Sequence, residues 1–299
     1  MNVMVTGGSG FLGSNIVKKL LLEGHKVLVL SRSTNNQHPA ATHICSSMSD
    51  LWQIESQIEQ FNPDVVVHCA WKGGNNYKDV DSSLQYENVI EGVEFLKLLS
   101  KLPKVVKFIG FGSFAEYGTL TSQAMESDSE HPTNHYGLAK YAFKEVSRLL
   151  CERYGMQWGW IRPCYVYGPN DVSTRLIPGV VNRLLAGESV KLDGCHKLID
   201  YIFVDDFVNF AYSLIMKDVD GVYNLCSGQQ YNLRDVMLKI QSLMGAIGRI
   251  EFDDTLARPL TSPIICGNNE KIRAQSGIVN LTNLDTGLQK TIEYYNIKI

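Results

Sequence analysis

The chain has 299 residues, a net charge of −3 and 20% charged residues, which is typical of a soluble globular protein with one large domain or two unequal lobes. This charge excludes a global affinity for nucleic acid or for a membrane surface, and we expect neither as a partner. Seven scattered cysteines without a Cys-x-x-Cys pair indicate reduced, buried thiols, and no apolar run approaches the roughly 18 residues that span a bilayer. Because Met1 leads directly into an apolar run, with no room for a signal peptide, we expect a cytoplasmic protein.

A glycine-rich turn follows the first predicted strand. The apolar run at residues 3–5 leads into the sequence TGGSGFLG, and a helical pattern begins at Ser14. Glycine at Gly7 permits a tight bend, Gly10 lets backbone N–H groups approach a pyrophosphate, and Gly13 lets the helix lie close on the strand. A glycine triplet alone is also compatible with an ordinary flexible turn, but the strand before it and the helix after it favour a phosphate site at the helix N-terminus.

The second predicted strand, residues 26–30, ends at Ser31 and Arg32. In a dinucleotide-binding fold an acidic residue at this position binds the ribose 2′-hydroxyl of NAD, whereas a neutral residue beside an arginine accommodates the 2′-phosphate of NADP. The sequence therefore predicts NADP(H). The alternative for Arg32 is an ordinary solvated surface arginine.

The rest of the chain alternates between strands and helices. Apolar runs predict strands at residues 43–45, 64–70, 105–109, 158–161 and 201–204, helical periodicity predicts helices at residues 51–61, 82–102 and 136–154, and residues 71–80 and 162–171 are predicted loops. This order predicts an α/β fold, a Rossmann-type doubly wound parallel sheet with a ligand crevice at the carboxyl ends of its strands.

A second, smaller lobe is expected because the period becomes less regular toward the C-terminus. We expect a mixed α/β C-terminal substrate lobe, and the predicted division assigns residues 1–165 and about 198–216 to an NADP-binding domain and residues about 166–197 and 217–299 to the substrate lobe.

Three residues form a candidate catalytic group. Ser113 lies just beyond the predicted strand at 105–109, and Tyr136 and Lys140 stand on one face of a predicted helix. A tyrosine with a pKa of about 10 is a poor acid or base at neutral pH, and a nearby cation lowers that pKa. Ser113 would hydrogen-bond the same substrate oxygen, and Lys140 would also hold the nicotinamide ribose. A Tyr-x-x-x-Lys pair alone is commonly a surface pair, but its combination with the glycine turn favours catalysis.

These motifs resemble the extended short-chain dehydrogenases/reductases, in the branch of nucleotide-sugar epimerases, dehydratases and 4-ketosugar reductases. The resemblance covers nearly the whole chain and includes the glycine turn, residues 67–70, Asn88, Ser113 with residues 117–118, Tyr136 with Lys140, and residues 162–163, 166–169, 203–206, 223–224 and 227–228. It implies hydride transfer between nicotinamide and a sugar carbon, with the tyrosine as acid/base. It also implies a homodimer that pairs the helices at about 82–101 and 136–154.

Position and resemblance together predict the binding residues. The residues expected to contact the cofactor are Gly7, Ser9, Gly10, Phe11, Leu12, Gly13, Ser31, Arg32, Ser47, Cys69, Ala70, Trp71, Tyr136, Lys140, Pro163 and Val166. The residues expected to contact a nucleotide-sugar substrate are Lys72, Tyr165, Arg175, Lys197 and Arg258. For the basic residues among them, a solvated surface charge is the alternative interpretation.

Departures from the family pattern narrow the choice of reaction. Dehydratases of this branch carry acidic residues directly after the Ser/Thr, where this chain has Phe114 and Ala115, so 4,6-dehydration is not expected. Glu116 comes one place later and is expected to turn elsewhere. Epimerases retain NAD and usually show an acidic residue where this chain has Ser31 and Arg32, which favours a dissociable NADPH and a reductase.

Other positions carry weaker expectations. The arginine that usually binds the nucleotide diphosphate is replaced by Ile199, which puts that contact in doubt. His68, at the end of an apolar run, is expected to be a packed core histidine rather than a catalyst. No cluster of His, Cys or Asp has the spacing of metal ligands, and we expect no metal.

The sequence thus supports three hypotheses. The first is NADPH-dependent reduction of a nucleotide-linked 4-keto-6-deoxyhexose, contributing a deoxysugar to a polysaccharide or a glycosylated metabolite. The second is a nucleotide-sugar epimerase with a tightly held NAD(P). The third is a non-catalytic NADP-sensing or scaffold protein, against which the intact Ser113, Tyr136 and Lys140 argue.

Overall fold

The chain forms two compact units. The computed structural model describes residues 1–33, 38–73, 82–102, 104–256 and 262–297. The first unit comprises Met1–Gly118, Ser129–Arg162 and Val208–Tyr223, and the second comprises Thr119–Asp128, Pro163–Phe207 and Asn224–Ile299.

The unit boundaries differ from the expected domain boundaries. Residues 119–128, 163–165 and 198–207 pack with the second unit and residues 217–223 with the first. The segment around Ala124 joins the second unit because its N–H donates to the Cys266 carbonyl at 2.9 Å and its carbonyl accepts from Asn224 Nδ2 at 3.2 Å. The assignment of the cofactor to the first unit and of the substrate to the second remains a prediction.

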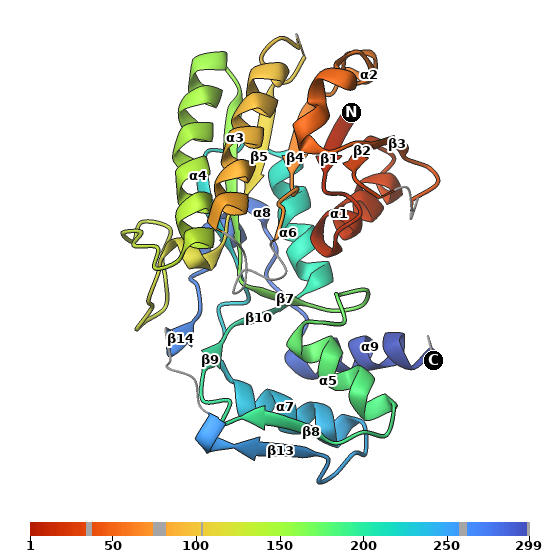
Figure 1. The fold of residues 1–299 in the computed structure, drawn as a ribbon, viewed down its shortest axis with the longest axis vertical. Helices are drawn as coiled ribbons and strands as arrows, with labels where there is room; N and C mark the ends of the chain where they lie inside the picture. Colours follow the sequence, from red (N-terminus) through yellow and green to blue (C-terminus); the bar gives the residue numbers. More distant parts are fainter. Residues whose placement is uncertain (34–37, 74–81, 103, 257–261, 298–299) are drawn as a thin grey trace. The chain divides into compact units, whose positions relative to one another are not determined.

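A parallel sheet forms the centre of the first unit. In the described part of the chain it has seven strands in the order β11-β6-β5-β4-β1-β2-β3 (Figure 1). The strands are β1 (Asn2–Thr6), β2 (Lys26–Ser31), β3 (Thr42–Cys45), β4 (Val65–His68), β5 (Lys107–Phe111), β6 (Gln157–Pro163) and β11 (Gly221–Leu225). Neighbours from β3 to β6 are paired in parallel. The Rossmann-type fold is thereby confirmed, and the strand order reverses at β1, where such folds bind ligands at the carboxyl ends.

Helices cover both faces of this sheet. On one face α2 (Glu55–Phe61), α3 (Ser82–Leu99) and α4 (His135–Tyr154) share a hydrophobic core with alternate strand side chains such as Met4 and Phe108. A right-handed crossover from β1 to β2 places α1 (Phe11–Leu22) on the other face, and α6 (Val204–Met216) lies on that face as well. These two helices are neighbours there, since Lys19 Nζ lies 5.2 Å from the Tyr212 ring centroid.

Several element boundaries differ from the expected ones. Helix α1 begins at Phe11 rather than at Ser14, because Gly10 already occupies the N-cap position. The predicted helix at 51–61 is divided into a 3-10 helix at Met48–Gln53, capped by Ser47, and α2. Strand β5 lies two residues later than expected, and the predicted loop at 162–171 contains the short strand β7 (Tyr165–Tyr167).

The second unit is a smaller mixed α/β assembly. Its short sheets pair β7 with β10 (Tyr201–Phe203), β8 (Val190–Asp193) with β13 (Ile250–Asp253), and β9 (Leu198–Ile199) with β12 (Tyr231–Asn232) and β14 (Ile264–Ile265). Its helices are α5 (Leu176–Leu185), α7 (Leu233–Leu243), α8 (Glu270–Ser276) and α9 (Leu284–Ile297), and the 3-10 helices of the chain include Phe114–Glu116 in the first unit and Asp254–Leu256 in the second.

No helix in the described ranges combines the length and the apolarity needed to cross a membrane.

Candidate active site

The glycine turn between β1 and α1 has a conformation that requires glycine. Gly7 has a φ of +68°, and a Cβ there would lie 2.8 Å from the backbone nitrogen of Ala70. A Cβ at Gly13 would lie 2.4 Å from the Gly7 carbonyl oxygen, so glycine lets α1 close onto the turn. The turn is also tied to the sheet, because the Gly7 N–H donates to the Leu30 carbonyl at 2.8 Å.

The N-terminus of α1 is suited to an anion. Gly10 is the N-cap, no side chain caps the helix, and the first turn contains no acidic residue. The N-terminal N–H groups of a helix and its dipole favour negative charge, and the exposed Gly10 presents no side chain that would cover them. The pyrophosphate of a dinucleotide fits this end, with Ser9, Phe11 and Leu12 beside it.

The end of β2 presents an exposed cation and no carboxylate. Ser31 is buried and its hydroxyl donates to the Ser33 carbonyl at 3.1 Å, whereas the Arg32 side chain is exposed. On the neighbouring strand β3, the Cys45 thiol lies 3.5 Å from the Arg32 carbonyl. Ser47 follows β3 and caps the 3-10 helix by accepting from the Ser49 N–H at 3.4 Å.

The end of β4 is fastened to β1 by a threonine. The Cys69 N–H donates to the Thr6 carbonyl at 3.1 Å, and the Ala70 N–H donates to the Thr6 hydroxyl at 3.2 Å. That hydroxyl in turn lies 2.8 Å from His68 Nδ1. Burial lowers the pKa of His68 to about 3 and raises the pKa of Cys69 to about 12, so both side chains are neutral at pH 7. His68 is therefore a packed core histidine.

Tyr136 and Lys140 lie one turn apart on α4, near Trp71. Lys140 is buried, its Nζ donates to the Phe111 carbonyl at 2.7 Å, and Nζ lies 3.6 Å from the Trp71 ring centroid and 5.9 Å from the Tyr136 ring centroid. Burial lowers the pKa of Lys140 to about 7, while the carboxylate of Glu116 opposes that shift. The ammonium thus lies beside the phenol ring, as the sequence spacing predicted.

Ser113 lies at the end of β5, next to the start of α4. Its hydroxyl caps the 3-10 helix Phe114–Glu116 by accepting from the Ala115 N–H at 3.1 Å, which leaves the hydroxyl proton to be donated to a substrate oxygen. A Cβ at Gly137 would lie 2.4 Å from the Ala115 carbonyl oxygen, so glycine lets the first turn of α4 pack against this segment. The packing brings the Ser113 segment and the Tyr136 turn together.

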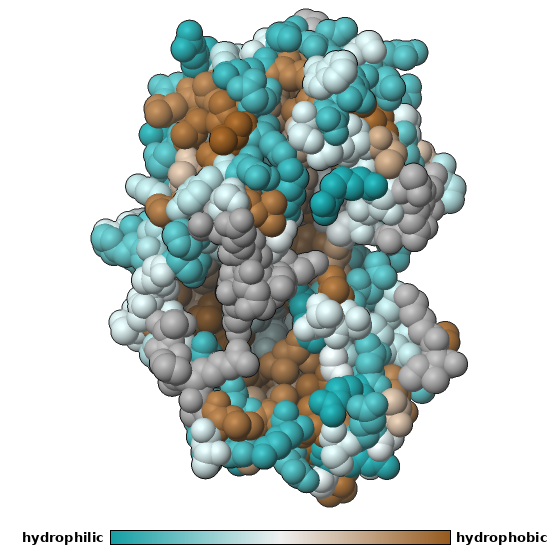
Figure 2. All heavy atoms as spheres, viewed as in Figure 1, coloured by the Kyte–Doolittle hydropathy of each residue, from teal (hydrophilic) through white to brown (hydrophobic). Residues whose placement is uncertain are grey.

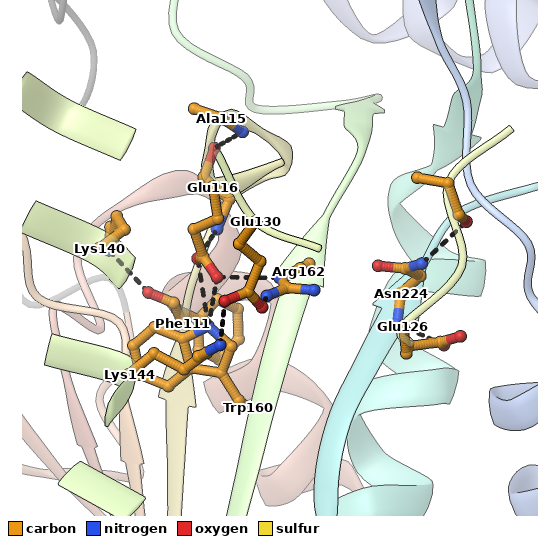
Figure 3. A network of polar contacts seen from close by, with 12 residues as sticks. Phe111, Ala115, Glu116, Glu126, Glu130, Lys140, Lys144, Trp160, Arg162 and Asn224 are labelled. Carbon is orange, nitrogen blue, oxygen red and sulfur yellow. Dashed lines mark hydrogen bonds and ion pairs between the residues drawn. The ribbon is translucent and has the colours of Figure 1, made fainter. Parts of the chain in front are cut away.

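The residues after Ser113 do not provide a dehydratase acid pair. Phe114 is buried, Ala115 has no acidic group, and Glu116 is turned into the core. The Glu116 carboxylate accepts from the Ser113 N–H at 2.7 Å and from Arg162 Nε at 2.8 Å (Figure 3). Sequence reasoning assigned no role to Glu116 because its partner Arg162 lies on β6, far along the chain.

Lys72 is engaged by acidic side chains of α3. Its Nζ forms an ion pair with Glu91 and lies 4.0 Å from a carboxylate oxygen of Glu87, while its backbone N–H donates to Asn88 Oδ1 at 2.7 Å. A role for Lys72 in substrate binding remains a prediction.

The second unit contains the remaining predicted residues. Val166 is buried, Tyr165 is 39% exposed, and their neighbour Pro163 ends β6. Arg175 is the N-cap of α5 and its Nη1 donates to the Val166 carbonyl at 3.4 Å, while the Lys197 carbonyl accepts from a backbone N–H of α7. Their ligand contacts remain predictions, and Arg258 lies outside the described residues.

The buried Asp200 follows Ile199, the residue that stands where the family usually has an arginine. Ile199 is buried, and the carboxylate of the following Asp200 accepts from the backbone N–H groups of Ser227 and Gly228 at 2.8 and 2.9 Å. Asp200 also accepts from the Ser227 hydroxyl at 2.6 Å, while burial raises its pKa. This cluster holds a loop and offers no cation to a phosphate.

Among the described residues, no group of three or more His, Cys, Asp and Glu side chains is arranged to hold a metal ion.

Comparison with known proteins finds relatives that cover most of the chain. Residues 3–226 match the NAD dependent epimerase/dehydratase family. A dTDP-6-deoxy-L-talose 4-dehydrogenase (NAD(+)) of Aggregatibacter actinomycetemcomitans is 25% identical over 78% of this chain and 87% of that enzyme. A dTDP-4-dehydro-6-deoxy-D-allose reductase of Streptomyces bikiniensis is 25% identical over 98% of this chain and 95% of its own length. The crystal structure of a UDP-glucose 4-epimerase from Thermotoga maritima with UDP-glucose shares the fold, with a TM-score of 0.92, 24% identity, and coverage of 100% of this chain and 99% of that chain.

Proposed function

Because the chain belongs to the NAD dependent epimerase/dehydratase family, we propose that it reduces a nucleotide-linked 4-keto-6-deoxyhexose with NADPH. The observation that carries this proposal is the end of β2, where a buried Ser31 and an exposed Arg32 stand in place of the acidic residue that binds the ribose 2′-hydroxyl of NAD. A net reduction oxidises one cofactor molecule in each turnover, and that molecule must then dissociate. A dissociable NADPH suits this role. The reductase relative from Streptomyces bikiniensis supports the substrate class.

The residues on α4 and β5 suit ketone reduction. When bound, the nicotinamide supplies the hydride that reduces C4 of the sugar. The Tyr136 phenol donates a proton to the oxygen that becomes negative, and the Ser113 hydroxyl donates a hydrogen bond to the same oxygen. Lys140 uses one of its ammonium protons for the Phe111 carbonyl and has two left for the nicotinamide ribose and the phenol. The turn from Gly7 to Gly13 binds the pyrophosphate.

The same segment argues against dehydration. Removing water from a sugar needs an acid and a base beside Ser113, and Phe114 and Ala115 supply neither. Glu116 has an exposed fraction of 0% and its carboxylate is occupied by core partners. Reduction needs only the proton donor and the oxygen-binding hydroxyl.

Substrate contacts are proposed in the second unit. Tyr165 offers an exposed phenol ring, and Arg175 and Lys197 offer positive charge for a nucleotide diphosphate. Arg175 Nε lies 3.7 Å from an oxygen of Asp171, whose pKa is raised to about 6 by burial, so binding of a diphosphate would compete with this carboxylate.

The test is a parallel titration of the purified protein with NADPH and NADH, after an assay for nicotinamide that survives purification. An empty site with a clear preference for NADPH is expected, and Arg32→Asp should reverse the preference because a carboxylate repels the 2′-phosphate and accepts from a 2′-hydroxyl. The matched control is Lys26→Asp, an equal change of charge at the exposed start of the same strand. Turnover is then measured with nucleotide-linked 4-ketosugars.

Nucleotide-sugar epimerisation is the second candidate. The dehydrogenase relative from Aggregatibacter actinomycetemcomitans carries NAD(+) in its name, so NAD is used among the relatives of this chain. Retained NAD in the purified protein would contradict the interpretation of Arg32 and would favour an epimerase, which returns the hydride to the same sugar in each cycle.

We also propose that the protein is a homodimer through α3 and α4. These helices pack against each other and leave large apolar side chains exposed on their outer faces. The exposed residues are Tyr86, Ile90, Leu138, Val146 and Leu149. Figure 2 shows hydrophobic side chains in the region where Figure 1 places these helices, and exposed apolar side chains gathered on one face are typical of a protein interface.

A further inference from the structure

Glu116 is a buried carboxylate bonded directly to the backbone of the proposed catalytic serine. Oε1 accepts from the Ser113 N–H at 2.7 Å, Oε2 accepts from Arg162 Nε at 2.8 Å, and both oxygens lie within 3.2 Å of Trp160 Nε1 (Figure 3). A carboxylate with an exposed fraction of 0% is stable only when its charge is paired and its oxygens are hydrogen-bonded. These partners meet that requirement.

The same network reaches α4. Arg162 also forms an ion pair with Glu130, and Glu130 forms one with Lys144, which lies one turn beyond Lys140 (Figure 3). Arg162 Nη1 has no hydrogen-bond partner among the described residues, but the guanidinium carbon lies 4.3 Å from the Tyr117 ring centroid, where a cation is favourably placed. The network therefore joins the Ser113 segment, β6 and α4.

Two carboxylates on Arg162 differ in what else they contact. Glu116 accepts from the Ser113 N–H, two residues after the Phe111 carbonyl that accepts from Lys140 Nζ, and from this position its charge acts on Lys140. Glu130 is 11% exposed, and the side chains that it pairs with are Lys144 and Arg162. Replacing either one removes one negative charge from the same arginine, so the pair provides a matched comparison.

Within the described part of the chain, Glu116 is the negatively charged group that acts on Lys140. Lys140 faces His68 at the end of β4 and Cys69 directly after it, Tyr136 on its own helix, and the Phe111 carbonyl of β5. His68 and Cys69 are neutral at pH 7, because burial shifts their pKa values to about 3 and about 12. Without the carboxylate, burial alone would favour the neutral amine.

We infer that Glu116 is a positioning residue that fixes the backbone of Ser113 and holds Lys140 as an ammonium. The inference rests on the proposed function for the roles of those two residues. Buried ion pairs can often be replaced without loss of stability, so stability alone does not explain why this carboxylate lies against the Ser113 N–H.

The first test needs neither substrate nor cofactor. Lysine labelled with 13C at Cε is followed by NMR through a pH titration, with the Lys140 resonance assigned by its loss in Lys140→Arg. In Glu116→Gln the pKa of Lys140 should fall by about 1 unit relative to the wild type, whereas in Glu130→Gln it should stay nearly unchanged. Equal shifts in the two variants, or no shift in either, would overturn the charge role.

The second test separates position from charge. Glu116→Asp keeps the charge but shortens the side chain by one methylene, so the carboxylate withdraws from the Ser113 N–H. We expect a nearly normal titration of Lys140 with kcat reduced about tenfold or more and KM changed little, because the hydroxyl is misplaced for the reacting oxygen. In Glu116→Gln the alkaline limb of the kcat profile should also move to lower pH.

Thermal unfolding of Glu116→Gln, Glu116→Asp and Glu130→Gln is measured as a control that each variant is folded. If Glu116 has a purely structural role, kcat should follow the folded fraction, and Glu116→Asp and Glu130→Gln should have the same kcat. That result would overturn the positioning role. If the wild type reduces no ketosugar, the proposed function fails, while the NMR titration still decides whether Glu116 controls the protonation of Lys140.

Discussion

At the scale of single residues, the proposed site consists of a proton donor, Tyr136, and two groups that orient it and the substrate, Lys140 and Ser113. Lys140 is fixed by the Phe111 carbonyl and covered by the Trp71 ring, so its ammonium cannot swing away from the phenol. The Ser113 hydroxyl accepts one hydrogen bond from the Ala115 N–H and keeps its proton for a ligand. In the proposed reaction, Tyr136 is the residue that donates its proton.

Replacing Tyr136 by phenylalanine should abolish turnover and leave cofactor binding nearly unchanged. The substitution removes the transferable proton while the ring remains against Trp71, with ring centroids 6.4 Å apart in the wild type. General acid catalysis contributes about 10²- to 10⁴-fold, so kcat should fall by at least about 10². The measurement is NADPH oxidation together with a fluorescence titration of NADPH. Tyr141→Phe on the same helix is the control, and substantial activity in Tyr136→Phe would contradict the assignment.

His68 should make the protein less stable in acid. Its pKa is about 3 in the folded protein and about 6.5 when unfolded, so the unfolded state binds more protons between these values and stability falls as the pH falls below about 6.5. The loss between pH 7 and pH 5 is about 2 kcal/mol for this residue. Urea unfolding at both pH values measures it. In His68→Asn the difference between the two pH values should shrink by about that amount, and an unchanged difference would count against the neutral buried histidine.

At the scale of elements, one lysine connects the central sheet to the end of a helix. Lys107 at the start of β5 is buried, and its Nζ donates to the carbonyls of Leu214, Ile215 and Lys217 at 3.4, 2.9 and 2.6 Å. These carbonyls belong to the C-terminal end of α6, where helix carbonyls lack partners and the dipole favours a cation. Lys107 thereby fixes α6 against the sheet.

Lys107→Met should destabilise the protein by about 2 kcal/mol, because the apolar side chain fills the space but leaves buried carbonyls without a donor. The free energy of unfolding in urea measures this effect. Lys101→Met is the matched control, since Lys101 forms an exposed ion pair with Glu55 at 2.7 Å and such surface pairs contribute about 0–1 kcal/mol. Equal losses in the two variants would show that Lys107 does not cap α6.

Local sequence patterns predicted those elements whose conformation depends on neighbouring residues in the chain. The buried run of β4 and the alternation of strands and helices indicated the parallel sheet, and Gly7 and Gly13 marked a turn whose geometry requires glycine. The three residues of β7 were missed because so short a strand has too few residues to show a period. Glu116 was assigned no role because the burial of its charge depends on Arg162, 46 positions later, and no local pattern reports such a pairing.

At the scale of the whole molecule, α3 and α4 expose large apolar side chains that the described part of a single chain leaves uncovered. Ile90 lies one turn after Tyr86 on α3, and Leu138, Val146 and Leu149 recur at helical spacing on α4. A two-fold axis through such a face makes each subunit bury the same residues. The proposed dimer therefore uses the helix that also carries Tyr136 and Lys140.

The double variant Ile90→Glu/Leu149→Glu should be a monomer. A two-fold interface contains every residue twice, so two substitutions place four carboxylates in one apolar contact, where their desolvation and mutual repulsion oppose association. Sedimentation should give twice the chain mass of 33.5 kDa for the wild type and the single chain mass for the variant. Leu22→Glu, at an exposed leucine of α1, is the control and should remain dimeric. A wild-type protein that sediments as a single chain would contradict the proposed dimer. A double variant that remains dimeric would show that α3 and α4 do not form the interface.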